Sequence, residues 1–136
     1  MANQFLIKNR MADMRALSAS EITALQNGTY DGVELLGYYQ KGDTATPIIY
    51  YLAPASPDPG SDNGGSVIEV GSVKLEHRFN GTTDIIYFGA AVALSNNYEA
   101  IQNCFANNNI RTCKKIKTTY LVVFILIFLY LLCPGG

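Results

Sequence analysis

The sequence predicts a mainly β protein with short helices at its flanks. Two runs rich in β-branched and aromatic residues, at 33–39 and 48–52, have the composition of strands. Shorter apolar runs of the same kind follow at 67–70, 73–75 and 85–88. A helical spacing of apolar residues occurs only on either side of this region, near 19–26 and 98–105. We therefore expect a small β unit with one short helix near each end.

The first helix is predicted over residues 19–26. Ser18 and Glu21 have the spacing of a capping box, in which the serine hydroxyl accepts a backbone N–H and the glutamate accepts the N–H of the serine. The Asn27-Gly28 pair then favours a left-handed end to the helix. Residues 1–17 are expected to form an extended arm with one turn near its end.

The second helix is predicted over residues 98–105. Tyr98, Ile101 and Phe105 are spaced so that they share one side of it. The run of asparagines at 107–109 is expected to end this helix.

Two turns organise the β region. The first, Lys41-Gly42-Asp43, separates the two longer strand runs, which we expect to pair as a hairpin. The second, Asp62-Asn63-Gly64-Gly65, consists of residues that tolerate a positive φ and can reverse the chain before residue 67. It closes a segment, 53–65, that holds three prolines and three glycines and is expected to be an exposed loop. The predicted structural turn residues are Gly42, Asp43, Asp62, Asn63, Gly64 and Gly65.

Composition argues against several classes of function. The chain has 10 Lys and Arg against 11 Asp and Glu, a formal net charge of -1, so it lacks the basic surplus typical of nucleic-acid binding. Its three cysteines, Cys104, Cys113 and Cys133, form no CxxC pair and are odd in number, which favours buried reduced thiols. His77 lies far from them in the sequence, so no metal site is expected. No pattern indicates a cofactor.

The C-terminal region differs abruptly from the rest of the chain. Residues 120–133 form an almost wholly apolar run of 14 residues, shorter than the about 20 that a membrane-spanning helix needs. Two interpretations stay open: contact with a membrane through 118–133, or a reading frame lost after about residue 111. Residues 1–14 contain no long apolar run, so no classical signal peptide is expected.

Several motifs resemble the N-terminal region of phage tail spikes and related pectate-lyase-like proteins. They are Gly37-Tyr38-Tyr39, Gly42-Asp43, Tyr50-Tyr51 and Asp62-Asn63-Gly64-Gly65-Ser66-Val67-Ile68. In that family they precede a strand and a capping helix that lead into a right-handed parallel β-helix. The segments similar to that strand and that helix are 84–90 and 99–105. The resemblance covers about residues 32–106.

The resemblance implies a fold and a role. The fold would be a small β unit leading into the N-terminal cap of a right-handed parallel β-helix, with the coils of that β-helix missing. The role would be a structural connector of a polysaccharide-targeting protein, in a truncated fragment without catalysis. The divisions are an N-terminal arm and short helix at 1–31, a small β connector domain at 32–90, the β-helix entry and capping helix at 91–111, and a basic flank with the apolar tail at 112–136.

The resemblance also implies partners and locations. It favours a homotrimer, contact with a polysaccharide, and a virion or extracellular location. Aromatic rings give flat apolar platforms for sugars, and the candidate contacts are Tyr38, Tyr39, Tyr50 and Tyr51, although packing in the core is the simpler expectation for half of them. No catalytic residue is assigned. The alternatives are a small membrane-anchored protein with an N-terminal β domain, and a subunit of a polysaccharide lyase or hydrolase.

Overall fold

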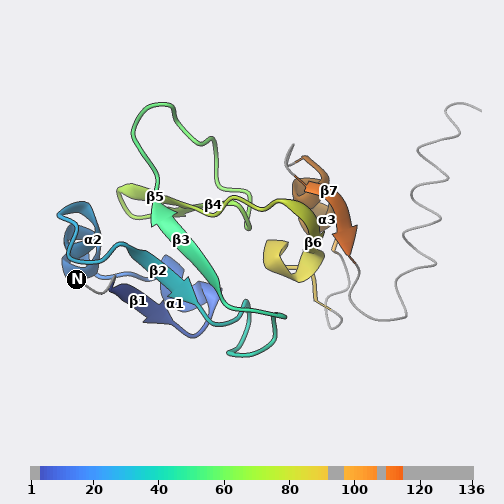
Figure 1. Ribbon diagram of the computed structural model, residues 1–136, viewed down its shortest axis with the longest axis horizontal. Helices are drawn as coiled ribbons and strands as arrows, with labels where there is room; N and C mark the ends of the chain where they lie inside the picture. The colour runs from blue at the N-terminus through green and yellow to red at the C-terminus, as the bar shows by residue number, and fades with distance from the viewer. Residues whose placement is uncertain (1–3, 92–96, 107–109, 115–136) are drawn as a thin grey trace, which may run out of the picture.

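A computed structural model describes residues 4–91, 97–106 and 110–114 of the chain (Figure 1). Most of the described chain forms a five-stranded sheet of order β1-β2-β3-β5-β4. Its strands are β1 (Phe5–Lys8), β2 (Gly32–Leu35), β3 (Ile48–Leu52), β4 (Val67–Val70) and β5 (Val73–Glu76). A second sheet pairs β6 (Gly81–Asp84) with β7 (Ile110–Lys114). The helices are α1 (Met11–Arg15), α2 (Ala19–Gln26), the 3-10 helix η1 (Ile85–Phe88) and α3 (Tyr98–Ala106).

The larger sheet confirms the prediction of a small, mainly β unit with short helices. Strands β2 and β3 pair antiparallel, with Val33 opposite Tyr50, so the predicted hairpin is confirmed. Strands β4 and β5 form a second hairpin around Gly71, whose φ is 57°, and β5 pairs with β3. Only β1 runs parallel to its neighbour, β2, which makes the sheet mixed.

Helix α2 forms over the residues predicted. Ser18 and Glu21 make both halves of the capping box: the Glu21 N–H donates to Ser18 Oγ at 3.3 Å, and the Ser18 N–H donates to Glu21 Oε2 at 2.8 Å. Glu21 also accepts from Lys8 Nζ at 2.8 Å, which attaches the helix to β1. These donors lower the pKa of Glu21, Lys8 contributing most.

The N-terminal segment is part of the sheet. Residues 5–8, expected within an extended arm, form the edge strand β1, and the turn expected near the end of that arm is α1. Met14 of α1 is completely buried, and Leu6 of β1 packs against the same core. The boundary expected at residue 31 therefore falls between two strands that pair with each other.

One continuous core joins the large sheet to η1 and α3. Alternate residues of the large sheet, among them Val33, Tyr50 and Leu75, point into it and are fully buried. The same cluster continues through Phe79 into η1 and α3, where its buried members are Tyr87, Phe88, Ala90, Ala100 and Cys104. Figure 1 shows the large sheet at one end of the molecule and β6, η1, α3 and β7 at the other. Because residues from both ends are buried in one cluster, the two ends pack against each other.

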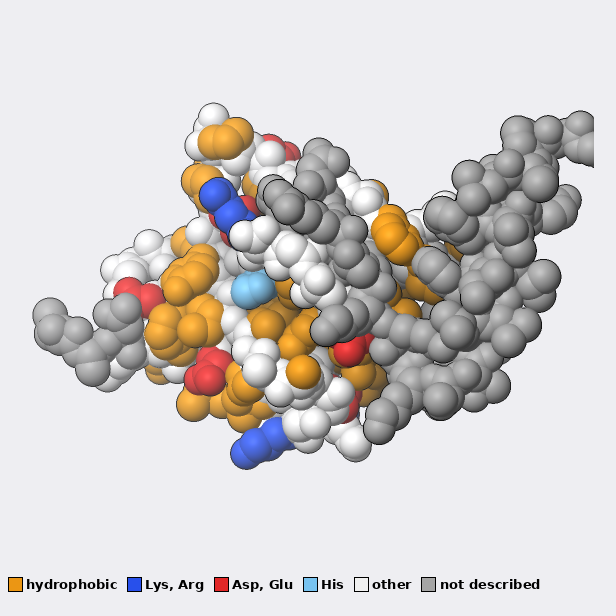
Figure 2. All heavy atoms as spheres, turned by 45° about the vertical axis from the view of Figure 1, so that its right-hand side comes forward, with side chains coloured by type: hydrophobic (Ala, Val, Ile, Leu, Met, Phe, Trp, Pro, Cys, Tyr) orange, Lys and Arg blue, Asp and Glu red, His pale blue; other side chains and the backbone are white. Residues whose placement is uncertain are grey.

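The single histidine lies between the two sheets in sequence and packs against aromatic rings. The ring centroid of His77 is 4.5 Å from that of Phe79 and 5.8 Å from that of Tyr50, and its Nδ1 lies 2.7 Å from the carbonyl oxygen of Ile49. Figure 2 shows the histidine side chain among the apolar side chains of this face. Packing therefore accounts for its position.

The strand predicted at 85–88 is wrong. These residues form η1, and the strand lies immediately before them, at β6. The Asp84 carboxylate accepts the Ile86 N–H at 3.2 Å and starts the turn, and Gly89, at φ 90°, ends it. Tyr87 and Phe88 are neighbours and both are buried, which a strand with alternating faces does not readily allow.

Helix α3 confirms the predicted helix, but another of its sides faces the core. Its buried residues are Ala100 and Cys104, whereas Tyr98 and Phe105 are 47% and 51% exposed. Cys104 is completely buried and takes part in a disulfide bond, so the expectation of a reduced thiol is wrong for this residue.

Two of the expectations for the C-terminal part fall outside the described residues. They are the helix end at 107–109 and membrane contact through 118–133. Within the part of the chain that the structure describes, no helix has the length and apolar character to cross a membrane.

Candidate functional site

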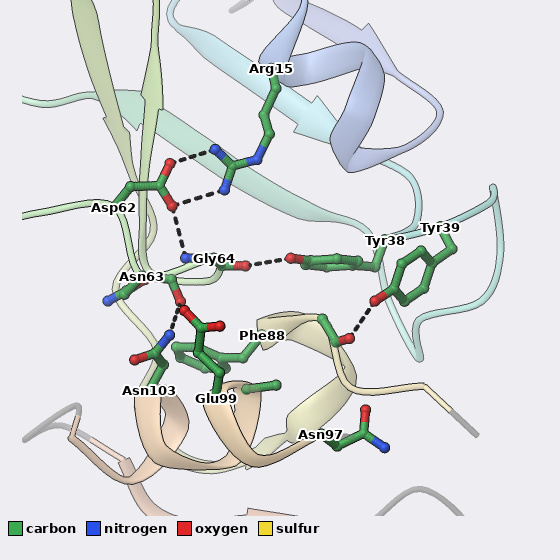
Figure 3. A pocket seen from close by; sticks show the side chains of 12 residues that line it. Arg15, Tyr38, Tyr39, Asp62, Asn63, Gly64, Phe88, Asn97, Glu99 and Asn103 are labelled. Carbon is green, nitrogen blue, oxygen red and sulfur yellow. Dashed lines mark hydrogen bonds and ion pairs between the residues drawn. The ribbon is translucent and has the colours of Figure 1, made fainter. Parts of the chain in front are cut away.

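Five of the motif residues meet between the large sheet and the η1–α3 region, namely Tyr38, Tyr39, Asp62, Asn63 and Gly64. They surround a pocket of about 310 Å³, shown in Figure 3. Its walls come from α1, from the loop that follows β2, from the turn before β4, from the end of η1, and from α3. The lining residues are Arg15, Tyr38, Tyr39, Asp62, Asn63, Gly64, Phe88, Gly89, Asn97, Glu99, Ala100 and Asn103.

Asp43 fixes the loop that carries the two tyrosines. Its carboxylate accepts the backbone N–H groups of Tyr38 and Tyr39, each at 2.7 Å, and of Gln40 at 3.0 Å. Gly37 is required before them, because a Cβ there would lie 1.9 Å from the carbonyl oxygen of Gln40. Gly42 completes the turn at φ 87°. The predicted structural turn is therefore a loop folded around one carboxylate.

The turn at 62–65 is held by two side chains. Asn63 Oδ1 accepts the N–H groups of Gly65, Ser66 and Val67 at 2.9–3.1 Å. Asp62 accepts the N–H groups of Gly64 and Glu69, each at 2.9 Å. Such a turn can be predicted from its sequence, because asparagine and aspartate readily accept nearby backbone N–H groups.

Arg15 of α1 binds the same turn through an ion pair with Asp62. Both terminal nitrogens of the guanidinium donate to the carboxylate, and the distance from Nη2 to Oδ1 is 2.8 Å. Partial burial opposes ionisation of Asp62, but the hydrogen bonds from Arg15 and from the backbone outweigh it, so the pKa of Asp62 is lowered. The pair ties the N-terminal helix to the pocket.

The four candidate tyrosines differ in position. Tyr38 and Tyr39 meet at the pocket, with ring centroids 5.0 Å apart, and their hydroxyls donate to the carbonyls of Gly64 and Gly89. Tyr50 is fully buried, and its hydroxyl donates to Gly65 at 2.6 Å. Tyr51, on the opposite face of β3, is 51% exposed and packs edge-on against Phe5. Sequence reasoning could not separate these roles.

Burial has electrostatic consequences for the inner tyrosines. Desolvation raises the pKa of Tyr38 to about 12 and raises that of the more deeply buried Tyr50 as well. Both phenols therefore stay protonated at neutral pH and keep donating their hydroxyl hydrogens to the glycine carbonyls.

Helix α3 contributes the lower wall of the pocket (Figure 3). Asn103 Nδ2 donates to the carbonyl of Asn63 at 2.9 Å. The Asn97 side chain pairs with the N–H and the carbonyl of Ala91, at 2.9 and 3.0 Å. Glu99 makes no hydrogen bond or ion pair with any described residue.

Three pocket residues were not predicted from the sequence: Arg15, Glu99 and Asn103. Glu99 and Asn103 are four residues apart and so share a side of α3, a signal present in the sequence. The apolar spacing of Tyr98, Ile101 and Phe105 instead drew the prediction to another side of this helix. Within the described residues, no cluster of three or more His, Cys, Asp or Glu side chains is arranged to hold a metal ion.

Fold and site together define a small mixed-sheet protein with a polar pocket at an internal junction. No protein-family model matches the chain. No curated protein matches it either.

Proposed function

We propose that this chain is the N-terminal connector segment of a tail-spike-like or pectate-lyase-like, polysaccharide-targeting protein. Its task would be to hold the five-stranded sheet and the η1–α3 region in one fixed orientation. Catalysis is not part of this role. Assembly as a homotrimer and a virion or extracellular location belong to the same proposal.

The observation that carries the proposal is that the polar side chains of the motifs form hydrogen bonds with the protein's own backbone. Backbone N–H groups donate to Asp43 and Asn63, and the hydroxyls of Tyr38 and Tyr50 donate to backbone carbonyls. A catalytic group must have atoms available for substrate, whereas a structural motif is satisfied internally. These residues therefore have the pattern of an architectural junction.

Three contacts cross the junction directly. Tyr39 donates to Gly89, and Asn103 donates to Asn63. The Tyr87 hydroxyl donates to the Thr46 carbonyl at 3.1 Å and accepts the N–H of Thr46, with 3.2 Å between the nitrogen and the hydroxyl oxygen. Each contact joins the loops of the large sheet to η1 or α3, and all surround a shared apolar core. Such contacts stabilise one relative orientation.

The order of elements after the junction also supports the proposal. Strands β6 and β7 are parallel, and η1 and α3 lie between them in the chain. A parallel pair needs a crossover of this kind, and a parallel β-helix consists of parallel neighbours. The proposed β-helix cap rests on this arrangement together with the sequence resemblance.

Amide hydrogen exchange on the full chain tests the connector role. The variant carries Tyr39→Phe and Asn103→Ala, which remove two cross-junction hydrogen bonds. We expect protection of the amides in β6 and α3 to fall by at least about tenfold, while β2 and β3 keep theirs.

The control variant carries Tyr51→Phe and Asn9→Ala, the same residue types placed away from the junction. If the junction variant and this control give the same exchange pattern, the two hydrogen bonds do not couple the parts and the proposal fails. A uniform loss of protection over the entire chain would likewise contradict a specific junction.

A further inference from the structure

We propose that the junction pocket is a binding site for one neutral pyranose unit of a carbohydrate. The inference rests on the proposed polysaccharide-targeting function and deepens it by giving the ligand class and the residues that would contact it. It assigns a ligand to the space between Arg15, Tyr39, Glu99 and Asn103.

The size and composition of the pocket suit a small polar ring. Its volume of about 310 Å³ lies at the lower end of the range for small-molecule sites. Tyr38, Tyr39 and Phe88 line it with aromatic rings, and Tyr39 is 44% exposed. An aromatic ring offers an apolar surface to the C–H side of a sugar, while polar groups bind the hydroxyls at its edge.

Several polar atoms at the rim are available to a ligand. The Glu99 carboxylate has no partner among the described residues and can accept two or more hydroxyl hydrogens. Asn103 uses its Nδ2 on the Asn63 carbonyl, so its Oδ1 can accept as well. Arg15 uses its two terminal nitrogens on Asp62 and retains further N–H groups that can donate. A hydroxyl both donates and accepts, so a polyol can satisfy all three groups.

The charges favour a neutral ring over an anionic one. Among the lining residues the charged groups are Arg15, Asp62 and Glu99, one positive and two negative. Arg15 is already paired with Asp62, which leaves the charge of Glu99 uncompensated. A carboxylate on the ligand would be repelled by Glu99, so a uronic acid should bind worse than the matching neutral sugar.

The floor of the pocket is positioned before any ligand arrives. Gly64 and Gly89 both have positive φ, and their carbonyls are held by the hydroxyls of Tyr38 and Tyr39. A Cβ at Gly89 would lie 2.8 Å from the hydroxyl oxygen of Tyr38, so only glycine permits this approach. A preformed site lowers the cost of ordering on binding.

Saturation-transfer NMR with the full chain tests the site. The probes are the methyl glycosides of glucose, galactose, mannose and N-acetylglucosamine, with glucuronate as the anionic comparison. We expect at least one neutral glycoside to bind with a Kd in the millimolar range and to shift the amide signals of Gly64, Gly89 and Asn103. Glucuronate should bind at least about tenfold more weakly than the best neutral glycoside.

Glu99→Gln is the decisive variant, because it keeps size while removing the charge. It should weaken binding of the neutral glycoside about tenfold and reduce the discrimination against glucuronate. Glu69→Gln, an exposed glutamate on β4, is the matched control and should leave binding unchanged, and thermal melting of both variants verifies that they fold.

Three results would overturn the inference. They are the absence of saturable binding by every neutral glycoside, equal effects of the two variants, and binding of glucuronate as tight as that of the best neutral glycoside. Any of these outcomes leaves the hydrogen-exchange test of the connector untouched, so the two proposals can fail separately.

Discussion

Replacing Gly65 by alanine should lower the free energy of unfolding by about 3 kcal/mol. A Cβ at this position would lie 2.3–2.6 Å from three ring carbons of Phe88, far inside contact distance. Phe88 is 3% exposed and belongs to the core that joins the large sheet to η1 and α3, so its ring cannot simply move into solvent. The Gly65 carbonyl also receives the buried hydroxyl of Tyr50, so movement of the turn disturbs a second buried contact.

Urea unfolding of Gly65→Ala measures this loss, with Gly28→Ala as the control. Gly28 has a positive φ of 77°, but a methyl group added there would meet nothing within 4 Å, so its variant should lose only the about 1 kcal/mol of backbone strain. Equal losses for both variants would show that the contact with Phe88 contributes nothing and that strain alone explains the result.

Replacing Asp43 by alanine should cost a similar amount, about 3 kcal/mol. The carboxylate accepts three consecutive N–H groups in the Tyr38–Tyr39 loop, and alanine leaves all three without their charged acceptor. Because that loop also holds Met11, whose N–H donates to the Tyr38 carbonyl at 2.8 Å, the loss should extend to α1.

The matched control for this variant is Asp58→Ala. Asp58 is strongly exposed and contacts Lys74 and the Gly60 N–H in the proline-rich loop, so its removal should change the urea midpoint little. Thermal or urea unfolding of both variants provides the comparison. A midpoint for Asp43→Ala as high as that of the control would contradict a structural role for the carboxylate.

Local patterns in the sequence predicted much of the fold. Helix α2 follows from the Ser18–Glu21 capping box, and the β2–β3 hairpin follows from two strand-like runs around a glycine-containing turn. The turn at 62–65 was predictable for the same reason, since its side chains bind its own backbone. Interactions between residues this close in the sequence can be predicted from the spacing of the residue types.

Elements that depend on distant partners were not predictable in this way. Strand β1 is extended because β2, more than twenty residues later, pairs with it. The apolar residues at 85–88 have the composition of a strand, but packing of Tyr87 and Phe88 into one core, between Asp84 and Gly89, selects a 3-10 turn. The pocket could not be predicted for the same reason, because Arg15 of α1 and Asp62 before β4 are distant in the sequence and meet only when the large sheet has formed.

Residual dipolar couplings of the backbone amides test the central claim most directly. That claim is that the motif residues hold the large sheet and the β6–η1–α3 region as one rigid body. Couplings from β1–β5 and couplings from β6, η1 and α3 should then fit a single alignment tensor with the two parts oriented as in Figure 1. Two tensors of clearly different magnitude or orientation would mean that the two parts reorient independently, and would contradict the connector account.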